Sequence, residues 1–155
     1  MKQFVLIPLL LMAPLSEARG TTPQHVITSS DPASSPFLAG IKSTIEKYLG
    51  RPYVWGSSGM KSFDCSGFIW RVMSENGMLL KRTTARKFYM FLKPAPKEEQ
   101  SNFGTLVFFN DLKHVGIVES SDAFYHAQVS IGTNRSLMNS YWRPKIYGFR
   151  RIPSP

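Results

Sequence analysis

The order of hydrophobic patterns along the chain constrains its fold most. Between residues 35 and 92, apolar side chains recur at helical spacing in three segments. From residue 105 onward the apolar runs are short, rich in β-branched and aromatic residues, and separated by turn residues; they read TLVFF, HVGIVES, AFYHAQ and KIYGFRRI. Helices first and strands afterwards are typical of an α+β domain. We therefore expect N-terminal helices packed on a C-terminal antiparallel β-sheet.

The expected helices have recognisable ends. Ser35 is a candidate N-cap, and Pro36 after it suits the first helical position. Gly50 suits the C-cap of the same helix, because glycine adopts the left-handed conformation that often ends a helix. Two further helices are expected at residues 65–76 and 84–92.

The first eighteen residues predict export. One lysine precedes an apolar run at residues 4–15, and a Ser-x-Ala step ends at Ala18; both features are typical of a secretory signal peptide. The run is short for a membrane span. Pro8 and Pro14 disfavour the alternative of a buried N-terminal helix. We expect residues 1–18 to be removed and the mature protein to be secreted or periplasmic, without a stable membrane anchor.

The remainder of the chain is expected to form one domain. Residues 19–34 are rich in Thr, Ser and Pro and have few large apolar side chains, which predicts a flexible leader. Residues 35–155 are enough for one hydrophobic core and too few for two. We expect a single domain that acts as a monomer.

The charge of the chain favours an anionic partner. There are 19 basic and 10 acidic side chains, a net charge of +9 that removal of the signal peptide leaves unchanged, because that segment holds one of each sign. A cell-envelope polymer, a membrane surface and nucleic acid all fit such a surplus. The basic residues form no recognisable nucleic-acid motif, so a solvated basic face is the commoner explanation and we expect no nucleic-acid partner.

Cys65 is the only cysteine, so no internal disulfide can form. A lone thiol in an exported protein is either buried and inert or reactive. A helix N-terminus and a nearby imidazolium both lower a thiol pKa, and Cys65 is expected to open a helix. After the leader the chain contains two histidines, His114 and His126, both in expected strands.

A hairpin would bring these two histidines together. The segment VGIVESSDAFY has the form of two strands joined by a turn around residues 120–122. A three-residue loop pairs Glu119 with Ala123 and leaves His114 and His126 as diagonal neighbours on one face, within about 7–8 Å. A two-residue turn would instead place them on opposite faces.

Two histidines beside a thiol suit nucleophilic catalysis. One imidazole would accept the thiol proton and the other would orient the first, as in cysteine hydrolases. A metal site is the competing use of these residue types, but one Cys and two His without a clear fourth ligand are a weak set. We therefore expect a catalytic site with no metal and no cofactor.

A series of motifs extends over about residues 37–151. In order they are GRPYVWGSSGMKSFDCSGFIWRV, RTTARK, LVFF, HVGIV and YHA, of which FDCSG and HVGIV are the specific ones. With this order and spacing the chain resembles the NlpC/P60 cysteine peptidases, papain-like enzymes of bacterial cell walls. The resemblance implies a papain-like fold and a catalytic domain at residues 35–155.

The resemblance also implies a catalytic triad. Cys65 matches the family nucleophile, His114 the general base, and His126 the third polar residue that orients the base. The implied reaction is hydrolysis of an amide bond in peptidoglycan stem peptides, between D-glutamate and the diamino acid that follows it.

Three further residues receive roles from the resemblance. Tyr53 matches a tyrosine beside the nucleophile whose hydroxyl helps to stabilise the oxyanion, and Asp64 and Ser66 fall where the family lines its substrate groove. From the residues alone, the favoured interpretations are that Tyr53 is a core aromatic and Asp64 a helix cap. The chain departs from the family at Lys87, where a Gln is usual, and at Thr105, where an Asp is usual.

Two other functions stay open from the sequence. One is a thiol acyltransferase or amidase acting on another envelope amide or a lipid, which an apolar groove would favour. The other is a catalytically silent envelope-binding protein, although a binding module has no need for an intact set of one thiol and two imidazoles.

Overall fold

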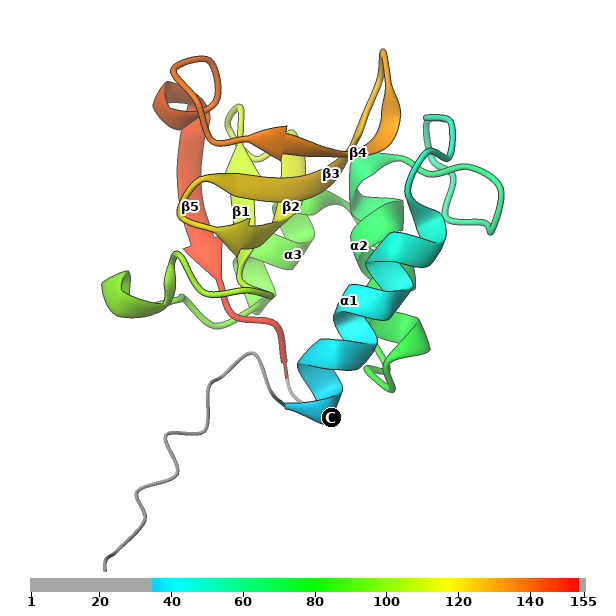
Figure 1. The fold of residues 1–155 in the computed structure, drawn as a ribbon, viewed down its shortest axis with the longest axis horizontal. Coiled ribbons are helices and arrows are strands. Elements are labelled where there is room, and N and C mark those ends of the chain that lie inside the picture. Colours follow the sequence, from blue (N-terminus) through cyan, green and yellow to red (C-terminus); the bar gives the residue numbers. More distant parts are fainter. Residues whose placement is uncertain (1–34, 154–155) are drawn as a thin grey trace, which may run out of the picture.

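The helices and strands follow the predicted order, with one additional strand. The structure is a computed structural model that describes residues 35–153, so the predicted signal peptide and leader lie outside the described residues. The helices are α1 (Pro36–Tyr48), α2 (Cys65–Glu75) and α3 (Ala85–Phe91), and the strands are β1 (Leu106–Phe109), β2 (His114–Ser120), β3 (Ala123–Gln128), β4 (Gly132–Leu137) and β5 (Ile146–Arg150) (Figure 1). The predicted α+β architecture is confirmed.

The strands form a single antiparallel sheet in the order β4-β3-β2-β1-β5. The first four strands are neighbours in sequence, and β5 returns to pair with β1. α2 packs against β2 and β3, and α1 packs against α2 (Figure 1). The N-terminus of α2 therefore lies beside the strands that carry the two histidines.

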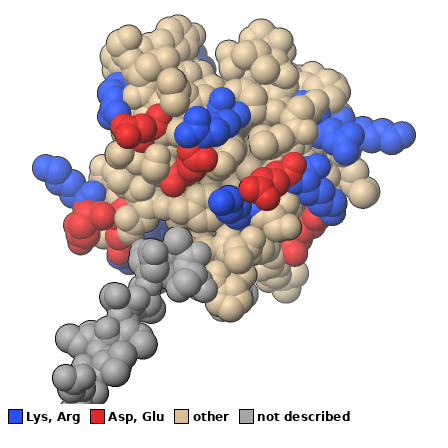
Figure 2. All heavy atoms as spheres, viewed as in Figure 1, with Lys and Arg blue, Asp and Glu red and all other residues tan. Residues whose placement is uncertain are grey.

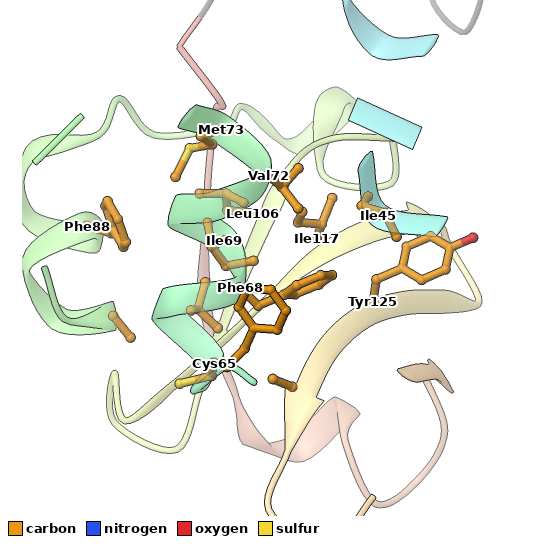
Figure 3. Packing of buried hydrophobic residues seen from close by; sticks show 14 of the residues in the cluster. Ile45, Cys65, Phe68, Ile69, Val72, Met73, Phe88, Leu106, Ile117 and Tyr125 are labelled. Carbon is orange, nitrogen blue, oxygen red and sulfur yellow. The ribbon is translucent and has the colours of Figure 1, made fainter. Parts of the chain in front are cut away.

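Alternating side chains of the strands divide the core into two clusters. On the helical side, the three helices pack against β1, β2 and β3 through residues that include Phe68, Ile69, Leu106, Ile117 and Tyr125 (Figure 3). On the other side, Met138 and Trp142 close a second cluster over Val107, Phe109, Val118 and Phe124. Because both faces are covered, β1 reads as a continuous apolar run rather than an alternating one.

The hairpin of β2 and β3 has the register predicted for a three-residue loop, although its turn has two residues. Ile117 faces Tyr125, as the predicted register requires. At the tip Ser120 pairs with Ala123, and the register shifts so that Glu119 is the extra residue of a β-bulge. The bulge compensates for the shorter turn, so the two histidines share one face of the sheet. The predicted alternatives are thus combined in one hairpin.

β4 is absent from the predicted strands. Its sequence, GTNRSL, has one large apolar residue and no run of β-branched or aromatic side chains. The strand forms because its backbone continues the ladder of β3, from Gln128 opposite Gly132 to Ala123 opposite Leu137. At the edge of a sheet polar side chains are well tolerated.

The helix ends agree with prediction, with one exception. Thr84 caps α3 and Asp64 caps α2, and each side chain accepts a backbone N–H of the first turn. Gly50 follows α1 with φ of 76°, the left-handed conformation expected there. Ser35 precedes α1, but its side chain forms no capping hydrogen bond.

Basic and acidic side chains are interspersed on the face of the molecule shown in Figure 2. Several of the acidic groups are engaged in ion pairs, including Glu75 with Lys47, Glu119 with Arg135, and Glu99 with Arg151. Part of the positive charge of the described residues is therefore neutralised in ion pairs.

Candidate active site

Cys65 is the first residue of α2, at one end of the helical-side core (Figure 3). The residue is 7% exposed. The cap before it is held tightly, because Oδ1 of Asp64 accepts the Gly67 N–H at 2.6 Å. A Cβ at Gly67 would collide with the Ser57 carbonyl oxygen, so this glycine lets the preceding loop lie against the first turn. The FDCSG motif therefore places the thiol at a helix N-terminus.

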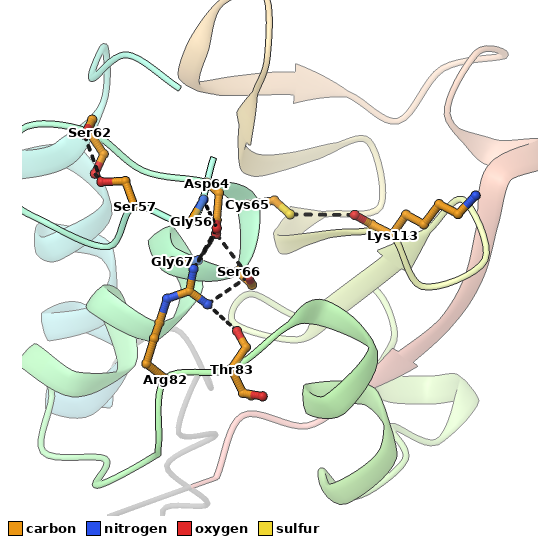
Figure 4. A network of polar contacts seen from close by, with 10 residues as sticks. All are labelled: Gly56, Ser57, Ser62, Asp64, Cys65, Ser66, Gly67, Arg82, Thr83 and Lys113. Carbon is orange, nitrogen blue, oxygen red and sulfur yellow. Dashed lines mark hydrogen bonds and ion pairs between the residues drawn. The ribbon is translucent and has the colours of Figure 1, made fainter. Parts of the chain in front are cut away.

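Arg82 anchors the capping carboxylate from the other side. One guanidinium nitrogen lies 2.8 and 2.7 Å from the two oxygens of Asp64, and the other donates to Ser66 Oγ at 3.0 Å (Figure 4). The Ser66 hydroxyl in turn donates to Asp64 Oδ1 at 3.0 Å. The RTTARK motif alone does not indicate this role of Arg82, because its partner Asp64 is distant in sequence.

The two histidines are joined directly. Nε2 of His114 lies 2.7 Å from Nδ1 of His126, and Nε2 of His126 lies 2.8 Å from Oγ of Ser136 on β4. His126 is fully buried and His114 is half-buried. The ring of Trp142 stacks on His114 at 5.6 Å between centroids and meets His126 edge-on at 5.1 Å. Neither Trp142 nor Ser136 was among the predicted site residues.

The thiol lies against the start of β2. Within residues 35–153 its hydrogen-bond acceptor is the Lys113 carbonyl, 3.8 Å from Sγ, rather than an imidazole nitrogen (Figure 4). The Val115 N–H also approaches the thiol. The structure therefore places Cys65 against the backbone on both sides of His114, and a thiol–imidazole hydrogen bond would require the thiol to leave the Lys113 carbonyl.

Burial keeps all three groups uncharged near neutral pH. It raises the pKa of Cys65 to about 11, with the Asp64 charge acting in the same direction and backbone N–H groups acting against it. Burial lowers the pKa of His114 to about 4. It lowers the pKa of His126 to about 3, to which the nearby His114 contributes. The expectation of a lowered thiol pKa is thus wrong, because desolvation outweighs the helix N-terminus.

A pocket of about 280 Å³ opens beside the thiol. Its lining brings together all three predicted accessory residues with Cys65; they are Tyr53, Asp64 and Ser66. Burial, together with Cys65 and Asp64, raises the pKa of Tyr53 to about 12. The Tyr53 hydroxyl therefore stays protonated and can donate a hydrogen bond into the pocket.

The turn from β1 to β2 is strained beside this pocket. Asn110, Asp111 and Leu112 have φ of 52°, 53° and 69°, a left-handed conformation that is uncommon for residues other than glycine. Leu112 lines the pocket, and the next residues are Lys113 and His114. Such strain persists where the surrounding structure enforces it and is common at functional sites.

The two departures from the family lie away from the thiol. Lys87 is exposed on α3 and does not line the pocket. Thr105 is buried, and its hydroxyl donates to the Glu99 carbonyl at 2.8 Å. Thr105 therefore anchors the loop before β1.

The described part of the chain, residues 35–153, has no group of three or more His, Cys, Asp or Glu side chains arranged to hold a metal ion. None of the helices in this same range is long and apolar enough to cross a bilayer.

Comparison with known proteins agrees with the motifs. Residues 50–151 match the NlpC/P60 family. The chain belongs to the NlpC/P60 family. It is 32% identical to the probable endopeptidase NlpC of Escherichia coli, over 96% of this chain and 97% of that protein. It is also 32% identical to the probable peptidoglycan endopeptidase LytE of Bacillus subtilis, over 74% of this chain and 34% of LytE.

A solved structure supports the same fold. A Staphylococcus aureus NLP/P60 family protein, described as similar to lipoprotein, matches with a TM-score of 0.68 and 32% identity, over 78% of this chain and 43% of that one. The chain spans about a third or less of the length of the first curated relatives it matches. The NlpC/P60 fold is therefore confirmed.

Proposed function

We propose that this NlpC/P60 protein is a monomeric cysteine peptidase that acts outside the cytoplasm, without a membrane anchor, on the stem peptides of peptidoglycan. The observation that carries the proposal is the pocket beside Cys65, with the thiol against the Lys113 carbonyl next to His114 and with His114 joined to His126. The naming of LytE as a probable peptidoglycan endopeptidase supports the substrate. The bond we propose lies between D-glutamate and the following diamino acid.

The reaction starts from a neutral thiol and a neutral imidazole. Since the pKa of Cys65 is raised and that of His114 is lowered, a standing thiolate–imidazolium pair is disfavoured. His114 therefore accepts the thiol proton as Sγ attacks the scissile carbonyl carbon. The S–C bond forms while the carbonyl electron pair moves onto oxygen. His126 holds the imidazolium of His114 through the 2.7 Å hydrogen bond.

The oxyanion requires hydrogen-bond donors in the pocket. The Cys65 backbone N–H belongs to the open first turn of α2, where amide groups lack partners within the helix. The Tyr53 hydroxyl lines the same pocket and remains protonated. We propose these two groups as the donors.

Three proton transfers complete the cycle. His114 gives its proton to the leaving nitrogen as the C–N bond breaks, which releases the amine product and leaves a thioester on Cys65. Water then attacks the thioester carbonyl while His114 accepts one of its protons. The C–S bond breaks, the carboxylic acid product leaves, and the thiol regains its proton from His114.

Asp64 acts mainly as a positioning residue in this scheme. Its two carboxylate oxygens accept hydrogen bonds from Gly56, Gly67, Ser66 and Arg82. They hold the nucleophile at the helix N-terminus. Ser66 shares this network, and both residues line the pocket where they can contact substrate.

The test is mass spectrometry of purified peptidoglycan after incubation with the mature protein. We expect released fragments whose new ends identify the bond, and no release by Cys65→Ala. EDTA should leave the rate unchanged. Product that persists in Cys65→Ala would contradict the cysteine mechanism.

The alternatives predict different outcomes. The pocket beside Cys65 is lined by apolar and aromatic residues such as Tyr53, Trp55 and Leu112 as well as by Asp64, Arg82 and Lys113. Acyl transfer to an added amine in place of hydrolysis would favour a lipid or other apolar amide substrate. A silent binding protein would sediment with peptidoglycan without forming any product.

A further inference from the structure

A chain of hydrogen bonds continues behind the histidine pair into β4. The Ser136 hydroxyl, 2.8 Å from His126 Nε2, donates to Asn134 Oδ1 at 3.0 Å. The Asn134 amide nitrogen donates to the Gly132 carbonyl at 2.8 Å. The register explains the contact, because Asn134 lies directly opposite His126 on the neighbouring strand and Ser136 lies one diagonal step away on the same face. The chain thus runs from the edge of the sheet to the proposed base.

The Gly132 carbonyl at the end of this series of hydrogen bonds determines the direction of each of them. The Gly132 carbonyl can only accept, so the Asn134 amide must turn its NH2 group toward it and its oxygen toward Ser136. The Ser136 hydroxyl therefore donates to Asn134 and must accept from His126. His126 carries its proton on Nε2, which leaves Nδ1 as an acceptor. His114 then donates from Nε2, and its Nδ1 is left with a free lone pair.

We propose that Ser136 and Asn134 are positioning residues that fix the tautomers of both histidines, so that Nδ1 of His114 is the proton acceptor in the reaction. The inference rests on the proposed function for its catalytic consequence, but the tautomers themselves are a property of the protein alone.

The reverse direction is disfavoured at two contacts. If Ser136 donated to His126, its oxygen would face the Asn134 oxygen at 3.0 Å with no proton between them. Rotating the Asn134 amide would remove that conflict and create another at the Gly132 carbonyl, 2.8 Å away. Protonation of His126 would also conflict, because its Nδ1–H would then point at the Nε2–H of His114, 2.7 Å away. Burial of His126 opposes that protonation.

The first experiment measures tautomers in the mature wild-type protein. Histidine labelled with nitrogen-15 gives separate signals for protonated and bare ring nitrogens in a long-range proton–nitrogen spectrum. The mature protein has a third histidine, His25, in the predicted leader. A His25→Asn variant lacks the signals of this residue and so shows which signals belong to His114 and His126. We expect bare Nδ1 and protonated Nε2 on both His114 and His126. A protonated Nδ1 on either ring would overturn the proposal.

The second experiment removes the determinant. Ser136→Ala should give mixed tautomers at His126 and lower kcat for peptide release roughly 10- to 100-fold with little change in KM, as expected for loss of one hydrogen bond to a buried group. Ser136→Thr keeps the hydroxyl and should retain wild-type tautomers and most of the activity. Ser140→Ala, at an exposed position outside the chain of hydrogen bonds, is the matched control.

The outcomes are separable from those that test the function. A Ser136→Ala protein with wild-type tautomers would overturn the proposal, whether or not its activity fell, because a loss would then be structural. Absence of peptidoglycan cleavage by the wild type, with the expected tautomers present, would reject the proposed function and leave the assignment of the tautomers standing.

Discussion

The ion pair between Arg82 and Asp64 should be a main support of the fold around the thiol. The Asp64 side chain is 11% exposed and that of Arg82 is 26% exposed. Breaking a buried pair costs about 3–5 kcal/mol, because the remaining charge is left without a partner. Arg82 is partly solvated, so we take the lower end and expect Arg82→Met to lower the free energy of unfolding by ~3 kcal/mol.

A pair of matched variants separates this effect from general damage. Arg143→Met removes an ion pair with Asp122 whose side chains are 54% and 79% exposed, and such pairs contribute at most ~1 kcal/mol. Adding Asp64→Asn to Arg82→Met should recover part of the loss, since an amide still caps the helix and leaves no unpaired charge. The wild type, Arg82→Met, Asp64→Asn and the double variant form a double-mutant cycle, which gives the coupling free energy between Arg82 and Asp64.

Urea denaturation followed by circular dichroism measures the unfolding free energies. For a domain of this size the loss in Arg82→Met corresponds to a fall in Tm of about 10 °C. The reasoning is refuted if Arg82→Met costs no more than Arg143→Met, or if Asp64→Asn makes the Arg82→Met protein less stable still.

Four further predictions concern the thiol and the histidines. Alkylation of Cys65 by iodoacetamide should be slow at pH 7 and accelerate up to about pH 11, because its raised pKa keeps the thiol protonated; a plateau below pH 8 would contradict this. The acidic limb of kcat/KM should lie near pH 4, the pKa of His114, rather than near 6.5. In the same way, folded stability should fall as the pH drops from about 6.5 toward 3, since His114 and His126 bind protons more weakly folded than unfolded; urea midpoints across this range measure it, and His126→Gln should reduce the slope. For activity, His114→Ala should lose nearly as much as Cys65→Ala, whereas His126→Asn should recover part of what His126→Ala loses; equal and total loss in all His126 variants would reverse the assignment of base and orienter.

Helices and apolar strands could be predicted because local sequence determines them. Pro36 at the first turn of α1, Gly50 after it, and the caps Asp64 and Thr84 act within a few residues. The apolar runs of β1 to β3 are explained by burial on both faces of the sheet. The FDCSG motif predicted the position of the thiol for the same reason, since its Asp and Gly shape the helix start that holds it.

The contacts that complete the site are long-range, and the sequence carries no local trace of them. Arg82 reaches Asp64 across 18 positions, and the raised thiol pKa follows from the packing of α2 against β2. The histidine register depended on a bulge at Glu119, whose presence no spacing rule indicates.

The strand β4 and the site residues Asn134 and Ser136, which it carries, were not predicted for the same reason. A strand recognised by apolar alternation is one whose side chains enter a hydrophobic core, yet the inward positions of this edge strand are used for hydrogen bonding to His126. Asn134 and Ser136 depress the apolar signal because they are polar, and they are polar because the buried imidazole next to them needs an acceptor. A polar segment that directly follows a strand with a buried histidine is therefore a reasonable place to look for an edge strand. In this chain the segment GTNRSL meets that description, and its backbone pairs with β3 along its whole length.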